Sequence, residues 1–173
     1  SRIAIIFNGS PLQTGEAESG ESEIRKYLIK NDLVEAIIGL PDNLFYKTNI
    51  FTYLWIINNN KPEKRKGKIQ LINAVSKFVK MKTSIGKKTN EIADTENNPQ
   101  INDITKIYKN FKEEKLCKIL DNDDSALQGY EENSNNNHDT SWIDGAIEEN
   151  LNVTVNNSFK LTVDLYGYLS NQG

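Results

Sequence analysis

A continuous apolar run near the start of the sequence, Ile-Ala-Ile-Ile-Phe at residues 3–7, constrains the fold more than any other feature. The run does not alternate apolar with polar positions, so it is not typical of a strand with one solvated face. It predicts a strand buried on both faces, as in the middle of a parallel sheet. Because a central strand should not open a domain, we expect the sequence to begin inside a larger domain.

The next segments predict an α/β fold. Ser19 and Gly20 precede a helix of about ten residues, whose first turn carries acids where the helix dipole favours them. A mostly apolar strand follows at 33–40, and this strand-helix-strand order is a right-handed βαβ unit by default. The most strand-like segment, 50–57, comes after a connection too short for a crossover, which favours an antiparallel neighbour.

Further elements are predicted downstream. Residues 68–72 predict a short strand, whereas 76–98 lack a regular period and indicate an irregular, basic segment. Pro99 suits the first position of an amphipathic helix that extends to about residue 114, and 116–120 predict another strand.

The last third of the sequence has a different character. Residues 125–150 are acidic and rich in asparagine, which indicates a linker. Alternating apolar residues on either side of Asn156 and Asn157 predict a β-hairpin. We therefore expect an α/β domain at 1–124, a linker at 125–150 and an unassigned hairpin tail at 151–173.

The formal net charge of −3 hides two opposite blocks. Residues 61–90 carry ten basic residues and one acid, and residues 111–150 carry three lysines and eleven acids. A charged run is most often a solvated surface, but the basic block also has the composition that binds a phosphate backbone.

The sequence lacks the residues that disulfides, metal centres, catalytic triads and common nucleotide-binding motifs require. Cys117 is the single cysteine, which excludes an intramolecular disulfide and a multi-cysteine metal centre and favours a reducing compartment. His138 is the single histidine and falls in the polar linker, so we expect neither a metal site nor a catalytic triad. There is no dinucleotide fingerprint, no P-loop, and no apolar run that approaches the length of a membrane-spanning helix. The sequence predicts a cytoplasmic protein without a self-sufficient catalytic site.

A set of segments matches one known family in order and spacing. They occupy residues 3–12, 20–25, 31–41, 44–50, 52–55, 61–72 and 86–88, and they include Gly-Glu-Ser-Glu-Ile-Arg, Leu-Phe-Tyr-Lys-Thr-Asn-Ile and Lys-Gly-Lys-Ile-Gln-Leu-Ile. Through these segments, residues 1–124 closely resemble the methyltransferase (modification) subunit of type I restriction-modification systems.

The resemblance implies a Rossmann-like domain that transfers a methyl group from S-adenosylmethionine to N6 of adenine in DNA. This sequence would supply the second half of that domain: its fifth strand, the following helix, and the sixth and seventh strands, of which the seventh is antiparallel. The family's cofactor loop and its Asn-Pro-Pro-[Tyr/Phe] catalytic motif lie upstream, and the prolines of this sequence are all isolated.

The resemblance also sets expectations for ligands and partners. We expect no catalytic residue, no metal and no cofactor binding in this chain alone, with S-adenosylmethionine held by the complete domain. The implied partners are DNA, the remaining half of the modification subunit, and the specificity and restriction subunits. No membrane partner is expected.

Two aromatic residues match the wall that packs on a flipped adenine in the wider adenine-methyltransferase group. Phe45 takes the position just before the seventh strand, with Tyr46 beside it, and an aromatic face suits an unstacked base. Asn49 replaces the family's usual glycine, and Gln13 replaces an aromatic residue. Asparagine tolerates a left-handed backbone, so the loop can keep its shape. Composition alone favours a core position for Phe45, and with the resemblance the core and base-wall interpretations are equally supported.

Contacts with the DNA backbone are predicted for the basic block, at Lys61, Lys64, Arg65, Lys66, Lys68, Lys87 and Lys88. An alternative is a non-catalytic α/β module that docks a specificity or nuclease subunit, with the open edge at the first strand capped by the chain's own residues, such as the tail hairpin. A weaker form of this alternative is plain DNA binding without catalysis.

Overall fold

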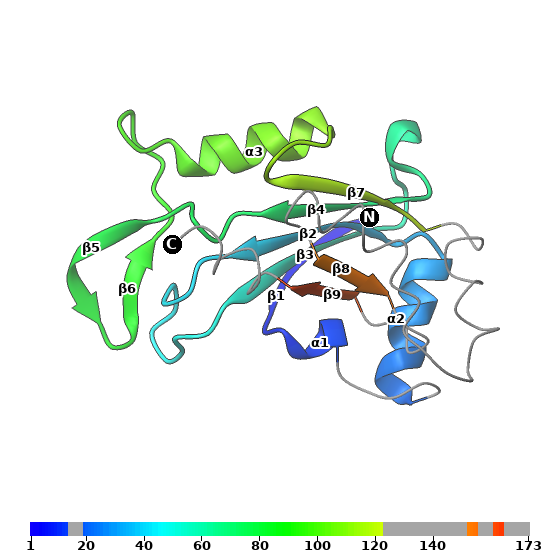
Figure 1. Ribbon diagram of the computed structural model, residues 1–173, viewed down its shortest axis with the longest axis horizontal. Helices are drawn as coiled ribbons and strands as arrows, with labels where there is room; N and C mark the ends of the chain where they lie inside the picture. Colours follow the sequence, from blue (N-terminus) through cyan, green and yellow to red (C-terminus); the bar gives the residue numbers. More distant parts are fainter. Residues whose placement is uncertain (14–18, 123–151, 156–160, 165–173) are drawn as a thin grey trace.

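The computed structural model describes residues 1–13, 19–122, 152–155 and 161–164. Its main feature is a five-stranded sheet in the order β1-β3-β2-β4-β7 (Figure 1). The strands of this sheet are β1 Arg2–Phe7, β2 Val34–Leu40, β3 Thr52–Asn58, β4 Lys68–Asn73 and β7 Cys117–Asp121. Two further pairs are β5 Val79–Ile85 with β6 Lys88–Glu91, and β8 Asn152–Val155 with β9 Leu161–Asp164. The helices are α1 Ser10–Gln13, α2 Gly20–Lys30, α3 Gln100–Asn110 and a 3-10 turn, η1, at Glu63–Arg65.

Strand β3 lies between β1 and β2 and runs antiparallel to both. In this register Trp55 of β3 pairs with Ile5 on one side and with Ile37 on the other. Strands β1 and β2 are therefore parallel to each other but separated by an inserted strand. The antiparallel prediction for residues 50–57 is confirmed. Beyond β2, the sheet continues with β4 in parallel and β7 antiparallel.

Helices cover both faces of this sheet, which makes the described part a mixed α/β fold (Figure 1). On one face Leu12 of α1 and Ile29 of α2 pack against Ile37 and Trp55. On the other face α3 packs through its apolar residues, including Ile107, against the cluster formed by β2 and β4. Strand β2 is buried along its whole length because it has a strand on each side and helices on each face.

The prediction that the first strand is buried on both faces is wrong for the described residues. Strand β1 pairs along one edge with β3, and its side chains are largely exposed, with Ile3 54% and Ile6 47% accessible. No other described strand pairs with its second edge. The alternative named the tail hairpin as a cap for this edge. In the described residues β8 and β9 pair only with each other, so they do not extend the sheet at β1.

Two other predictions need correction. The segment 76–98, expected to be irregular, contains the two-stranded ribbon of β5 and β6, which turns at Gly86 with a φ of 59°. The helix expected to extend to about residue 114 ends at Asn110 because Phe111 takes a left-handed conformation with a φ of 47°. Predictions for the linker and for His138 lie outside the described residues. None of the described helices is long and apolar enough to cross a membrane.

Candidate functional site

A loop at the carboxyl end of β2 carries the two predicted base-wall residues. Residues 41–51, here called the aromatic loop, begin at the buried Pro41 and end where β3 starts. Leu44 fastens the loop to the core through the cluster that contains Leu40 and Ile72. The backbone at Asn43 is left-handed, with a φ of 52°. Asn49, where the resemblance implies a glycine, is not among the residues with a left-handed backbone.

Phe45 and Tyr46 project from this loop into solvent. Phe45 is 38% exposed and Tyr46 is 59% exposed. The loop narrows to a short bridge in which the N–H of Thr48 donates to the carbonyl oxygen of Phe45 at 3.4 Å. Two adjacent aromatic side chains are thus held on a short, anchored loop with their rings accessible. The core alternative for Phe45 does not fit this exposure.

The basic ribbon, defined here as residues 79–91 of β5, β6 and their turn, is fastened to the aromatic loop. Backbone N–H groups of Lys87 and Thr89 donate to the carbonyl oxygens of Tyr46 and Asn43, at 2.9 Å and 3.0 Å. The side-chain amide of Asn43 returns a 3.0 Å bond to the carbonyl oxygen of Lys87. At the base of the ribbon, the buried Asn90 donates through Nδ2 to the backbone and side-chain oxygens of Asp42.

Gly86 brings the ribbon's turn against Tyr46. A Cβ atom at this glycine would lie 2.6 Å from Cε2 of Tyr46 and 2.8 Å from its carbonyl oxygen. Together with the positive φ, this approach requires a glycine. The ribbon and the aromatic loop therefore form one packed unit at the carboxyl ends of β2 and β4 (Figure 1).

The structure divides the predicted DNA-backbone residues between two ends of the sheet. Lys61 to Lys66 lie around η1 and Lys68 is the first residue of β4, whereas Lys87 and Lys88 lie on the ribbon that follows β4. A strand of six residues such as β4 spans roughly 20 Å. The basic block of the sequence is therefore not one surface, and within it Lys87 is hydrogen-bonded through its backbone to Tyr46.

Two members of the predicted set are buried and paired inside the protein. Lys61 is 5% exposed, and its Nζ donates to Oδ1 of Asp32 and to the carbonyl oxygen of Lys68. Arg65 is 3% exposed, and its guanidinium lies between the rings of Tyr108 and Phe111, 4.3 Å and 4.4 Å from their centroids. These contacts assign the two side chains a structural role.

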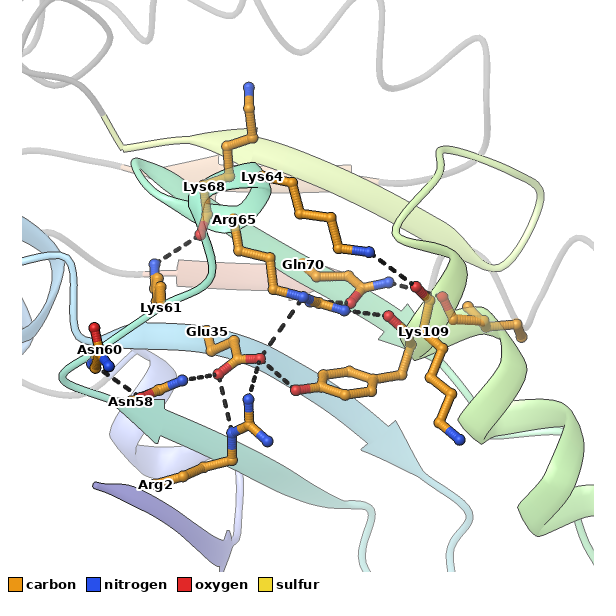
Figure 2. A network of polar contacts seen from close by, with 12 residues as sticks. Arg2, Glu35, Asn58, Asn60, Lys61, Lys64, Arg65, Lys68, Gln70 and Lys109 are labelled. Atoms are coloured by element: carbon orange, nitrogen blue, oxygen red, sulfur yellow. Dashed lines mark hydrogen bonds and ion pairs between the residues drawn. The ribbon is translucent and has the colours of Figure 1, made fainter.

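Arg65 pairs with a carboxylate that the sequence analysis missed, Glu35, near the start of β2. Figure 2 shows Arg2, Asn58 and Arg65 directed at this carboxylate. Asn58 Nδ2 donates to Oε2 at 2.7 Å, Arg2 donates to both oxygens at 3.3 Å, and the Tyr108 hydroxyl donates to Oε1. Burial raises the pKa of Glu35, but these hydrogen bonds and cationic charges outweigh it, so the pKa is lowered overall. The sequence contains one sign of this network, which is the acid Glu35 inside the apolar segment 33–40. A charge buried in such a strand needs polar or charged partners.

Asp32 forms a second polar centre at the same end of the sheet. Its carboxylate accepts hydrogen bonds from Lys61, from the N–H of Gly67 at 2.9 Å and from Nδ2 of Asn122 at 2.8 Å. Burial raises the pKa of Asp32, but these bonds and the lysine charge lower it overall. Burial is also the main cause of the lowered pKa of Lys61, which Asp32 opposes. Both centres connect the η1 region to β2 and to neighbouring elements.

Metal ligands and catalytic clusters are not found in the part of the chain that the structure describes. No group of three histidine, cysteine, aspartate or glutamate side chains is placed there to hold a metal ion. Two buried polar atoms near the carboxyl end of β2, Oγ1 of Thr52 and Nδ2 of Asn73, have no hydrogen-bond partner among the described residues. The arrangement can offer aromatic surface and positive charge to a ligand.

A family model described as N-6 DNA Methylase matches residues 1–145 of this chain. The match extends beyond residue 124, where the sequence predicts the end of the α/β domain.

Curated relatives are methylase subunits of type I restriction enzymes. The chain is 36% identical over 130 residues to the MjaVIII methylase subunit of Methanocaldococcus jannaschii, which covers 75% of this chain and 21% of that protein. It is 42% identical over 74 residues to the HindI methylase subunit of Haemophilus influenzae, which covers 42% of this chain and 16% of that protein. The chain thus spans 21% of the length of the two Methanocaldococcus jannaschii relatives that align over 130 residues.

Solved structures show the same likeness. A crystal structure of the methyltransferase subunit of a type I restriction-modification system from Streptococcus thermophilus has a TM-score of 0.60 and 25% sequence identity. That match covers 75% of this chain and 25% of the other. A structure from work on assembly of a type I restriction-modification system has a TM-score of 0.52 at 12% identity and shows a likeness of fold.

Proposed function

Because this chain belongs to the N-6 DNA methylase family, we propose that it forms part of an enzyme that methylates N6 of adenine in DNA, with S-adenosylmethionine as the methyl donor. Within that enzyme, residues 1–124 are the second half of a Rossmann-like methyltransferase domain. The antiparallel β3, inserted between the parallel strands β1 and β2, supports this assignment because the family's seventh strand is antiparallel.

The exposed pair Phe45 and Tyr46 carries the functional part of the proposal. An enzyme that modifies a base inside a duplex must rotate the base out of the stack and hold it against a flat apolar surface. Phe45 offers such a surface at the end of β2, on a loop anchored by Leu44 and by the basic ribbon. Stacking of one base on an aromatic ring contributes about 1–3 kcal/mol, enough to hold a flipped adenine in place.

The free edge of β1 supports the proposal that this sheet is part of a larger one. Ile3, Ile6 and Phe7 are exposed on a strand whose second edge pairs with no other strand of the described residues. Such an edge is unfavourable in water and is normally paired or covered. In the complete domain, we propose, a strand from the remaining half of the modification subunit pairs with β1 and buries these side chains.

One feature of the turn after β1 supports the proposal that S-adenosylmethionine is not held by this chain alone. The turn after β1 leads into the single-turn α1, and a Cβ atom on its Gly9 would make an ordinary 3.6 Å contact with Tyr53. The turn therefore shows no glycine-dependent cradle of the kind that lets a backbone approach a nucleotide closely. We propose that the cofactor is held by the remaining half and that this chain alone does not methylate DNA. No step of methyl transfer is assigned to its residues.

The remaining partners follow from the same assignment. Target recognition in type I systems belongs to a specificity subunit, so we propose that this chain acts in an assembly with specificity and restriction subunits. We also propose that the chain is divided into a domain at 1–124, a linker at 125–150 and a tail at 151–173.

Titration calorimetry with S-adenosylmethionine tests whether the chain is half of a cofactor-binding domain. The 173-residue chain is compared with a longer polypeptide of the same protein that includes an Asn-Pro-Pro-[Tyr/Phe] segment. We expect binding by the longer polypeptide and none by the 173 residues. Tight binding by the shorter chain, or no binding by either, would contradict the proposal and favour a non-catalytic module.

A further inference from the structure

The basic ribbon projects beyond the sheet at the same end as the aromatic loop (Figure 1). We propose that this ribbon is a DNA-binding arm, in which Lys82, Lys87 and Lys88 contact the phosphates beside the base held by the aromatic loop. The inference rests on the proposed function, which it extends from the target base to the DNA backbone.

The charge of the ribbon is the first argument. Residues 79–91 contain four lysines and one acid. No carboxylate within the described ranges forms an ion pair with Lys82, Lys87 or Lys88. Lys82 and Lys87 are exposed, and Lys88 is half-buried. Their charges are therefore available to an anion that approaches from solvent.

Near η1, at the other end of the sheet, two of the lysines form ion pairs with acids. Lys66 pairs with Glu63 and Lys68 pairs with Asp121, each at 2.7 Å. Lys64 is directed toward the carbonyl oxygen of Lys109 at 3.4 Å. Neutralisation by these acids lowers the attraction of Lys66 and Lys68 for phosphate, whereas the ribbon lysines have no such partner among the described residues.

The shape of the ribbon is the second argument. It is a two-stranded antiparallel pair, in which Lys80 pairs with Asn90 and Ile85 with Lys88. A ribbon of this kind is narrow enough to enter the major groove of B-DNA or to follow its backbone. The adjacent Phe45 and Tyr46 need access to a nucleotide rotated out of the same duplex.

The connection between ribbon and aromatic loop is the third argument. The Lys87 N–H bond to Tyr46, the close approach of Gly86 and the Asn90 contact with Asp42 join the two segments at three points. Phosphate contacts fix the register of a protein on DNA, whereas base contacts act only when that register is correct. A ribbon rigidly joined to the aromatic loop would set the position of Phe45 relative to the target nucleotide.

Fluorescence anisotropy with a labelled duplex tests the inference on the 173-residue chain. Three triple variants are compared with the unmodified chain, each lacking three positive charges: Lys82/Lys87/Lys88→Gln on the ribbon, Lys64/Lys66/Lys68→Gln near η1, and Lys109/Lys112/Lys115→Gln at the end of α3. Binding is measured at several salt concentrations from about 50 to about 200 mM, because each lost phosphate contact lowers the salt slope by about 1.

We expect the ribbon variant to bind more weakly and to lose about 3 from the slope of log K against log salt. The α3 variant should keep the slope of the unmodified chain. An equal loss in all three variants would indicate a simple effect of net charge and would overturn the inference. So would a loss confined to the η1 variant, an unchanged ribbon variant, or no DNA binding by the unmodified chain.

Phe45→Ala separates this inference from the proposed function. The substitution removes no charge, so it should leave the salt slope unchanged while abolishing adenine methylation by the complete enzyme. If Phe45→Ala leaves methylation intact and the ribbon variant loses its slope, the base-wall proposal fails and the ribbon inference stands. The opposite pair of results would remove the ribbon inference alone.

Discussion

The backbone N–H of Lys87 donates a 2.9 Å hydrogen bond to the carbonyl oxygen of Tyr46. The two residues lie on different elements, the turn of the basic ribbon and the loop between β2 and β3. This bond, with the close packing of Gly86 on the Tyr46 ring, joins the basic ribbon to the exposed aromatic pair Phe45 and Tyr46. A ligand that combines phosphates with an accessible base matches both features.

Gly86→Ala should destabilise the protein. Its backbone has a φ of 59°, and the added Cβ would meet Tyr46 at 2.6 Å. We expect the free energy of unfolding to fall by about 1–2 kcal/mol or more, because a left-handed alanine alone costs this much. Chemical denaturation measures the change. Gly20→Ala is the matched control: Gly20 begins α2 with nothing within 4 Å of its Cβ position, and the same substitution there should not destabilise.

Asn90→Ala should release the ribbon from the aromatic loop. Asn90 is buried and donates to the carbonyl oxygen of Asp42 at 2.9 Å and to Oδ1 at 3.1 Å. Loss of these bonds leaves buried acceptors unpaired, at a cost of about 1–3 kcal/mol. Hydrogen exchange of the Lys87 and Thr89 amides should become faster. In the exposed control Asn98→Ala, the exchange of these amides should not change, and equal protection in both variants would contradict the predicted coupling.

Glu35→Gln should be strongly destabilising. The Glu35 carboxylate is fully buried, and Arg65 would keep its buried charge without a negative partner. Removing one member of a buried ion pair typically costs about 3–5 kcal/mol. Glu63→Gln is the control, because Glu63 pairs with Lys66 on the surface. Its unfolding transition should stay close to that of the unmodified protein, and a similar effect of both substitutions would refute the importance of the buried network.

Acid should destabilise the protein through the same network. The pKa values of Glu35 and Asp32 are lowered in the folded state because their hydrogen bonds and cationic neighbours outweigh burial. Groups of this kind contribute stability above their unfolded pKa, and that contribution is lost as the pH falls through the folded pKa. The free energy of unfolding should therefore decline as the pH falls from about 5 to below 4. Denaturation at several pH values should show a shallower decline for Glu35→Gln.

Local patterns in the sequence predicted most of the sheet. Strands β2, β3 and β4 and the helix α2 follow from apolar runs and turn residues that lie within each segment. The antiparallel direction of β3 followed from the short connection before it. The neighbours of β1 were not predictable in this way, because its pairing with β3 joins residues from opposite sides of β2 in the sequence.

The candidate site was predictable only in part. Phe45 and Tyr46 were identified through a family resemblance, and the structure exposes both. The basic block was visible as composition, but composition does not show that β4 separates its two ends. Nor does it show that Arg65 is buried between two aromatic rings. The contact of Glu35 with Tyr108 spans 73 residues of sequence and depends on tertiary packing.

Mapping N6-methyladenine in cellular DNA tests the central claim most directly. The complete methylase and its specificity subunit are expressed in a host without adenine methylation, and methylated positions are read by single-molecule sequencing. The account predicts methylation at a defined sequence by the unmodified enzyme and by the exposed control Ile101→Ala, and its loss with Phe45→Ala at equal protein level and equal S-adenosylmethionine affinity. Full methylation by the Phe45→Ala enzyme would show that this residue is not the wall for the target base.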